Sequence, residues 1–244
     1  MHYLKLRCSR IILVSFVLFA VVVTIFPQID LSISRLFFNG KAFAHDPWWQ
    51  RLQQTALSWF LWFSVGSVVA IYACNRLLKR HFLGVDGRRV LFLVLVLMIG
   101  AGLIVNLGLK NHFGRARPRD VAEFGGKLQF TPAFVISHEC RTNCSFSSGD
   151  AAGGFFSLAL AMALSRRRRM FVAGAALGIT VSISRIASGA HFFSDTVTSF
   201  FVMLIVADVL YYYVVQTDAE RARDRSEGFV LKPAYRGVSV NSNM

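Results

Sequence analysis

The chain has 244 residues, 55% of them hydrophobic, and a formal net charge of +14. The hydrophobic residues fall in long runs, several of which reach the roughly 17–25 residues that cross a bilayer as a helix. This composition excludes an ordinary soluble domain. Because most basic residues flank the apolar runs, topology explains them better than nucleic-acid binding does.

Six apolar runs predict an all-α fold, a polytopic membrane bundle with six transmembrane helices. The runs cover approximately residues 11–27, 54–74, 90–109, 148–164, 171–186 and 194–215. No small-residue cleavage site follows the first run, so we expect this helix to be retained. Residues 1–215 are expected to form one domain, and the polar residues 216–244 a cytoplasmic tail.

The distribution of basic residues predicts the orientation of this bundle. Of the 27 Lys and Arg residues, 17 lie in segments that six crossings assign to the cytoplasm and ten in external segments, among them 28–52 and 110–147. This agrees with the positive-inside rule and puts both termini in the cytoplasm. Seven of the external ten lie between residues 110 and 185, which indicates a binding site.

Two external stretches carry candidate phosphate-binding residues. Lys110 and Arg117 offer a point charge and a planar fork for phosphate oxygens, although a basic cluster that reaches lipid headgroups would look similar. Ser148 and Gly149 precede an apolar helix. They could cap it, or cradle an oxyanion with a hydroxyl and free backbone N–H groups, or do both.

A third stretch combines Arg185, His191 and Asp195. If a helix begins near His191, Asp195 lies one turn away on the same face, where its carboxylate can hold one ring nitrogen. The other nitrogen is then free to attack, and Arg185 can hold an anion in front of it. The alternative is a structural histidine at the membrane interface.

Taken together, the three stretches resemble the type 2 phosphatidic acid phosphatase superfamily. Six residues separate Lys110 from Arg117-Pro118, Ser148-Gly149 follows, and five residues separate Arg185 from His191, with three more before Asp195. The resemblance covers roughly residues 90–200. It implies a helical bundle that works without a metal or another cofactor.

The resemblance also implies a role for each matching residue. His191 would form a phosphohistidine and Asp195 would orient it. The phosphoryl group would be held by Lys110, Arg117, Ser148, Gly149 and Arg185. This agrees with the chemistry, because phosphoryl transfer mainly needs positioning and neutralisation of charge, which three cations and a helix start can supply.

The second motif departs from the family pattern Pro-Ser-Gly-His, whose histidine protonates the leaving oxygen. Asp150 stands at that position, and a carboxylate in the first turn of a helix beside cations is stabilised in its ionised form. A weak acid favours a leaving oxygen that departs easily. We therefore expect the 1-phosphate of lipid A as substrate, hydrolysed on the periplasmic side of a bacterial inner membrane.

The sequence leaves open several other functions and the role of the segment 119–144 with its two cysteines. The same motifs fit a phosphatase for phosphatidylglycerophosphate or undecaprenyl pyrophosphate, a lipid phosphotransferase, or an inactive binder or transporter of phosphorylated lipids. Cys140 and Cys144 could form a disulfide, remain free thiols or bind a metal with His138 and Glu139. The segment 119–144 could select the headgroup or simply connect two helices.

Overall fold

The computed structural model describes residues 5–44, 47–165 and 167–217, and this part of the chain is helical, with two isolated bridges and no strand. The α-helices are α1 Lys5–Ile25, α2 Gln28–Arg35, α3 Pro47–Leu77, α4 Gly87–Leu95, α5 Lys110–His112, α6 Gly149–Leu164, α7 Arg168–Ala187 and α8 Phe193–Leu210. Two segments, η2 Val96–Leu109 and η5 Tyr211–Val215, are wound as π-helix. The all-α prediction is confirmed, whereas residues 218–244 of the predicted tail lie outside the described residues.

Each of the six predicted apolar runs is helical. Within the described ranges, four helices are long and apolar enough to span a membrane, or five if α1 and α2, which meet at 82°, form one broken span. α6 is apolar but has only 16 residues, about 24 Å, against a hydrocarbon core of about 30 Å. Four or five candidate spans are thus supported, and the sixth crossing stays a prediction.

The external segment predicted between residues 28 and 52 contains more helix than expected. α2 occupies residues 28–35, and α3 begins at residue 47 instead of near residue 54. Trp48 and Trp49 in this extension are largely exposed. The apolar run marks only the part of a helix that suits hydrocarbon, and a helix continues past it where aromatic and polar side chains suit the headgroup region.

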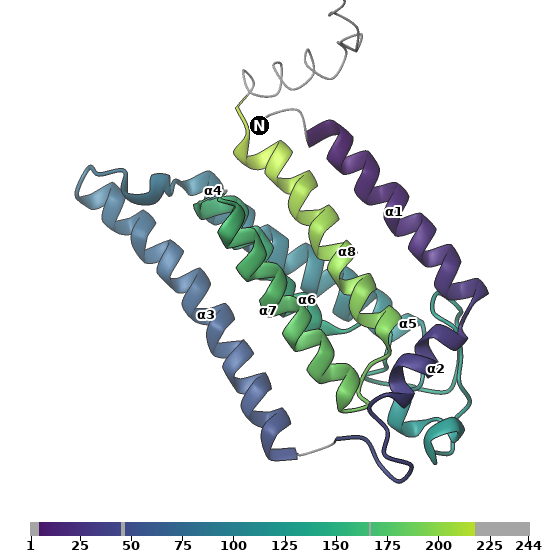
Figure 1. Cartoon of the computed structure of the whole chain (residues 1–244). Helices are drawn as coiled ribbons and strands as arrows, with labels where there is room; N and C mark the ends of the chain where they lie inside the picture. The colour runs from purple at the N-terminus through teal and green to yellow at the C-terminus, as the bar shows by residue number, and fades with distance from the viewer. Residues whose placement is uncertain (1–4, 45–46, 166, 218–244) are drawn as a thin grey trace, which may run out of the picture.

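α6 lies at the centre of the bundle, in contact with α3, α4, η2, α7 and α8 (Figure 1). Small residues allow α6 and α7 to approach closely. A Cβ added to Gly178 of α7 would lie 2.1 Å from the ring of Phe155, and one added to Gly154 of α6 would lie 3.1 Å from the Cα of Gly178. This packing completes the largest core cluster, which includes Phe92, Val96, Phe155, Phe156 and Met203.

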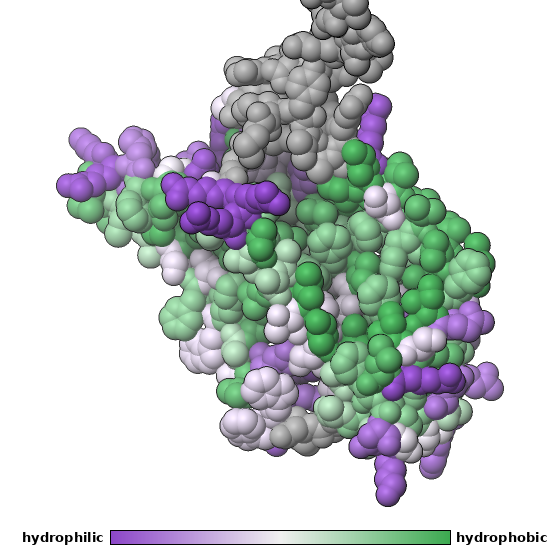
Figure 2. All heavy atoms as spheres, viewed as in Figure 1, coloured by the Kyte–Doolittle hydropathy of each residue, from purple (hydrophilic) through white to green (hydrophobic). Residues whose placement is uncertain are grey.

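The two ends of the bundle differ. One end carries the α3–α4 and α6–α7 turns and the last turn of α8, and the other carries α2, the α7–α8 turn and the long segment before α6 (Figure 1). Between them lies a belt of apolar side chains, with hydrophilic residues gathered above and below it (Figure 2). All the predicted site residues belong to the end that carries the α7–α8 turn.

We predict that Gly178→Ala destabilises the bundle, because the added methyl group would overlap the ring of Phe155. Overpacking of this kind typically costs about 1–3 kcal/mol. Gly66→Ala in α3 is the matched control, since a Cβ there meets no atom within 4 Å. Thermal unfolding in detergent should show a lower midpoint for Gly178→Ala only. Equal midpoints would contradict the α6–α7 contact.

Candidate active site

The backbone between α7 and α8 delivers His191. α7 ends at Ala187, and two residues later Gly189 has φ +61°, the left-handed conformation that glycine adopts readily just after a helix. The N–H groups of Ala190 and His191 then bond to the carbonyl of Arg185, at 3.1 and 3.3 Å. This turn therefore ties the histidine to the arginine before α8 begins at Phe193.

The imidazole of His191 is buried, with 2% of the residue exposed. Its Nδ1 lies 2.8 Å from the carbonyl oxygen of Ser145 and 3.7 Å from a carboxylate oxygen of Asp195. The nearest acceptor is thus a backbone carbonyl and not the predicted carboxylate, because α8 begins only after His191. A carbonyl can only accept, so Nδ1 carries the hydrogen and Nε2 has the free lone pair of a nucleophile.

Burial lowers the pKa of His191 below its ordinary value. Asp195 opposes this shift, whereas the positive charges of Arg185 and Arg117 add to it. A lowered pKa keeps the imidazole neutral at neutral pH. Orientation and charge state therefore both suit attack by Nε2.

Asp195 is fully buried and belongs to a hydrogen-bonded network. Its carboxylate accepts bonds from Arg115 Nη1 (2.6 Å), from the backbone N–H of Phe192 (2.8 Å) and from the hydroxyl of Ser145. Arg115 Nη2 also donates to Asp30 of α2 at 2.8 Å. Because Ser145 contacts both Asp195 and the imidazole, the network positions His191 indirectly.

Arg115 and Asp30 were not among the predicted site residues. Burial would lower the pKa of Arg115, but Asp195 and Asp30 outweigh it and raise the pKa above its ordinary value. The guanidinium also lies 4.3 Å from the ring centroid of Phe192. In the sequence, nothing distinguishes Arg115 from the basic residues around it. Asp30 is a carboxylate in a segment predicted to be external, and no motif includes it.

The structure brings the predicted cations together around Asp150. Arg185 Nε lies 3.0 Å from Asp150 Oδ2. Lys110, the first residue of α5, interacts electrostatically with Arg117, Asp150 and Arg185. Burial lowers the pKa of Arg117, and the charges of Arg119 and Arg185 lower it further. Three positive charges thus converge around Asp150, and two of them, Arg117 and Arg185, also act on His191.

Arg185 has hydrogen-bonding capacity that the described residues do not use. Its residue is 4% exposed, yet Nε and Nη1 have no hydrogen-bond partner in this part of the chain, since the contact with Asp150 lacks hydrogen-bond geometry. Buried donors without acceptors are costly and rare in folded proteins. Oxygen atoms of a phosphate group are acceptors that match a guanidinium.

Ser148 and Gly149 begin α6. The Ser148 hydroxyl accepts a bond from the N–H of Ala151 at 3.3 Å, so the capping alternative is confirmed. A Cβ on Gly149 would lie 2.7 Å from the side-chain oxygen of Asn106, a neighbour that sequence reasoning missed. Contact of Ser148 or Gly149 with phosphate stays a prediction.

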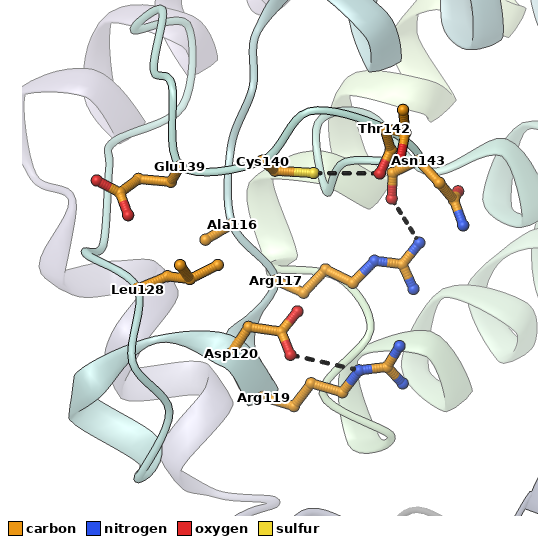
Figure 3. A pocket seen from close by; sticks show the side chains of 9 residues that line it. All are labelled: Ala116, Arg117, Arg119, Asp120, Leu128, Glu139, Cys140, Thr142 and Asn143. Carbon is orange, nitrogen blue, oxygen red and sulfur yellow. Dashed lines mark hydrogen bonds and ion pairs between the residues drawn. The ribbon is translucent and has the colours of Figure 1, made fainter.

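A disulfide joins Cys140 and Cys144, which confirms one of the three alternatives for this pair. The loop that it closes reaches one of the predicted phosphate-binding cations, because Arg117 Nη2 donates to the carbonyl of Asn143 at 2.7 Å (Figure 3). Among the described residues, no group of three or more His, Cys, Asp or Glu side chains is placed to hold a metal ion.

Comparison with known proteins agrees with this geometry. The chain is 34% identical over 180 residues to a lipid A 4′-phosphatase of Francisella tularensis subsp. novicida (strain U112), a match that covers 71% of the chain and 80% of that protein. It is 33% identical over 220 residues to a lipid A 4′-phosphatase of Rhizobium leguminosarum, covering 83% of the chain and 93% of that protein. No solved structure matches the chain at a significant level. Residues 91–218 match the PAP2 superfamily, the type 2 phosphatidic acid phosphatases that the three sequence motifs resemble. The chain belongs to this superfamily.

Proposed function

We propose that this protein removes the 4′-phosphate of lipid A through a phosphohistidine on His191. Membership of the PAP2 superfamily and the similarity to curated phosphatases make it a lipid phosphatase. The two relatives described above are named lipid A 4′-phosphatases, and the chain covers most of their length. The observation that carries the mechanism is the buried imidazole of His191, with Nδ1 bonded to a carbonyl and with the positive charges of Arg185 and Arg117 acting on the ring.

The reaction has two steps. His191 Nε2 attacks phosphorus, the bond between phosphorus and the sugar oxygen breaks, and that oxygen takes up a proton. Water then attacks the phosphohistidine, which releases inorganic phosphate and restores the imidazole. Lys110, Arg117 and Arg185 neutralise the phosphoryl oxygens, and this electrostatic stabilisation is the main contribution that a protein makes to phosphoryl transfer.

Asp150 supplies the proton in this proposal. In the free protein its carboxylate pairs with Arg185. A substrate phosphate that binds Arg185 competes with Asp150 for this cation, which can free the carboxyl group from the ion pair. The proposal gives Asp150 the role of general acid toward the 4′ oxygen, an ordinary alcohol oxygen that leaves poorly as an anion.

The 1-phosphate of lipid A is the second candidate. The Asp150–Arg185 ion pair favours it if the pair persists in the substrate complex, because no proton would then come from Asp150. An anomeric oxygen departs more easily than an ordinary alcohol oxygen and needs less help from an acid. The two candidates therefore differ in what they require of Asp150.

We also propose that the protein lies in a bacterial inner membrane, with both termini in the cytoplasm and the site facing the periplasm. The excess of Lys and Arg in the segments at the end away from the site supports this orientation. The disulfide supports it as well, because the Cys140–Cys144 loop lies at the site end and disulfides persist in oxidising compartments.

The first test measures phosphate release from lipid A by the purified protein in detergent, and identifies the phosphate that remains. Mild acid removes the anomeric phosphate, so it separates the two monophosphate products. We expect loss of the 4′-phosphate, and His191→Ala should slow it by about 10³-fold or more because no other group can form the intermediate. His138→Ala, at an exposed position outside the site, should have no effect.

Each contrary outcome identifies another function. Loss of the 1-phosphate would favour the second candidate. If phosphate is released faster from phosphatidylglycerophosphate or undecaprenyl pyrophosphate, assayed in parallel, then that lipid and not lipid A is the substrate. Transfer of the phosphate to an added acceptor would indicate a phosphotransferase, and binding of lipid A without any release would indicate an inactive binder.

The second test replaces Asp150. If it protonates the 4′ oxygen, Asp150→Asn should lower kcat by about 10²-fold, the lower end of what general acids contribute. Asp150→His, which restores the family motif, should recover activity. Full activity of Asp150→Asn would show that no proton passes through this residue, and would favour a leaving oxygen that needs no acid.

The third test concerns the charge of His191. Its lowered pKa predicts that the imidazole takes up a proton only below the ordinary histidine value of about 6.5. Activity should therefore persist at mildly acidic pH. NMR titration of the protein labelled in histidine, with the His191 signal assigned from His191→Ala, would measure this pKa without substrate. A value at or above 6.5 would overturn the assignment of a neutral, desolvated nucleophile.

A further inference from the structure

A cavity of about 320 Å³ lies beside the phosphate site (Figure 3). Its walls come from the turn that follows Arg117 and from the disulfide loop, and its polar lining residues are Arg117, Arg119, Asp120, Glu139, Thr142 and Asn143. The volume is at the lower end of the roughly 300–1,000 Å³ typical of small-molecule pockets. It suits one ring-sized headgroup better than a long chain.

The walls of the cavity are held by backbone hydrogen bonds. The N–H of Cys140 donates to the carbonyl of Gly114 at 2.9 Å, and the disulfide to Cys144 closes the loop. On the opposite wall the carbonyl of Asp120 accepts the N–H groups of Lys127 and Leu128, at 3.0 and 2.9 Å. A cavity with fixed walls loses little conformational freedom when a ligand binds.

Two arginines connect the cavity with the phosphate site. Arg117 lines the cavity and interacts electrostatically with Arg185, and so does Arg119. The N–H of Arg119 also bonds to the carbonyl of Gly189, at 3.1 Å, in the turn that delivers His191. A phosphate group held by Arg117 and Arg185 would therefore contact a residue that also lines the cavity.

The lining indicates the chemical class of the occupant. The carboxylates of Asp120 and Glu139 and the hydroxyl of Thr142 accept hydrogen bonds, whereas Arg117 and Arg119 donate them. Two arginines and two carboxylates balance each other in the lining, so the cavity has no excess of charge that would favour an ionic occupant. Ala116 and Leu128 add an apolar surface to the same cavity. An uncharged ring with hydroxyl or amide groups on its edge and C–H groups on its face fits all these features.

We propose that this cavity binds the sugar ring that carries the scissile phosphate, with Asp120 and Thr142 as hydrogen-bond partners of its polar groups. The proposal rests on the function proposed above and adds the residues that recognise the headgroup. It makes Arg117 common to both parts of the site, since one guanidinium contacts the phosphoryl oxygens and borders the sugar.

The test compares a substrate that has the sugar with one that lacks it. Asp120→Ala and Thr142→Val should each lower kcat/KM for lipid A, Asp120→Ala by about 10-fold or more, because a hydrogen bond to a charged group is lost. Both variants should stay within about threefold of the parent protein on 4-nitrophenyl phosphate. Glu123→Ala, an exposed carboxylate on the next turn and outside the cavity lining, is the matched control and should change neither value.

The outcomes separate this proposal from the proposed function. If the parent protein hydrolyses lipid A and the variants lose no selectivity, or lose activity equally on both substrates, the sugar subsite is wrong and the phosphatase assignment stands. If the parent protein hydrolyses 4-nitrophenyl phosphate and phosphatidylglycerophosphate but not lipid A, the proposed function fails and the subsite fails with it.

Discussion

The buried ion pairs of Arg115 hold the active-site end of the molecule together. This guanidinium joins Asp30 of α2 to Asp195 of α8, both of them buried. One cation between two carboxylates is tolerated because each carboxylate has further donors, including the backbone N–H groups of Ser194 and Phe192. Removing one partner of such a buried pair typically costs about 3–5 kcal/mol, because it leaves an uncompensated charge. The same network fixes Ser145, whose carbonyl orients the nucleophile.

A second group of charges, Lys110, Arg117, Arg185 and Asp150, differs from the Arg115 network because it has an excess of positive charge. The Arg115 network pairs its cation with two carboxylates, whereas Asp150 is the carboxylate that interacts with all three of Lys110, Arg117 and Arg185. The excess of positive charge is unfavourable for the folded protein by itself, and the unused donors of Arg185 add to the cost. Binding of a dianionic phosphate would offset both effects. The fold therefore separates a neutralised cation, Arg115, from the cations that we propose to bind the phosphate.

The sequence motifs identified the cations that we propose to bind phosphate, but not Arg115, which joins α2 to α8. The spacing of Lys110, Arg117, Arg185 and His191 identified the motifs, and the structure places these residues together. Arg115 has the same chemistry as Arg117 two positions later, and the difference appears only in the folded structure, where Arg115 is buried and paired with Asp30 and Asp195. The direct bond predicted between His191 and Asp195 assumed a helical step, but α8 begins at Phe193. Contacts that depend on a helix start or on a partner 85 positions away in sequence, as for Asp30 and Arg115, are not encoded in local patterns.

One substituted motif residue, Asp150, bears on which phosphate the protein removes. Asp150 in place of the family histidine favoured an anomeric phosphate, while the names of the relatives favour the 4′ position. Both are consistent with the ion pair in the free protein, because the charge around Asp150 changes when a phosphate dianion arrives at Arg185. The role of Asp150 in the reaction therefore depends on its surroundings in the substrate complex. In the proposed sugar subsite, selection between the two phosphates of lipid A would depend on which sugar ring the neighbouring cavity admits, and not only on how easily the oxygen leaves.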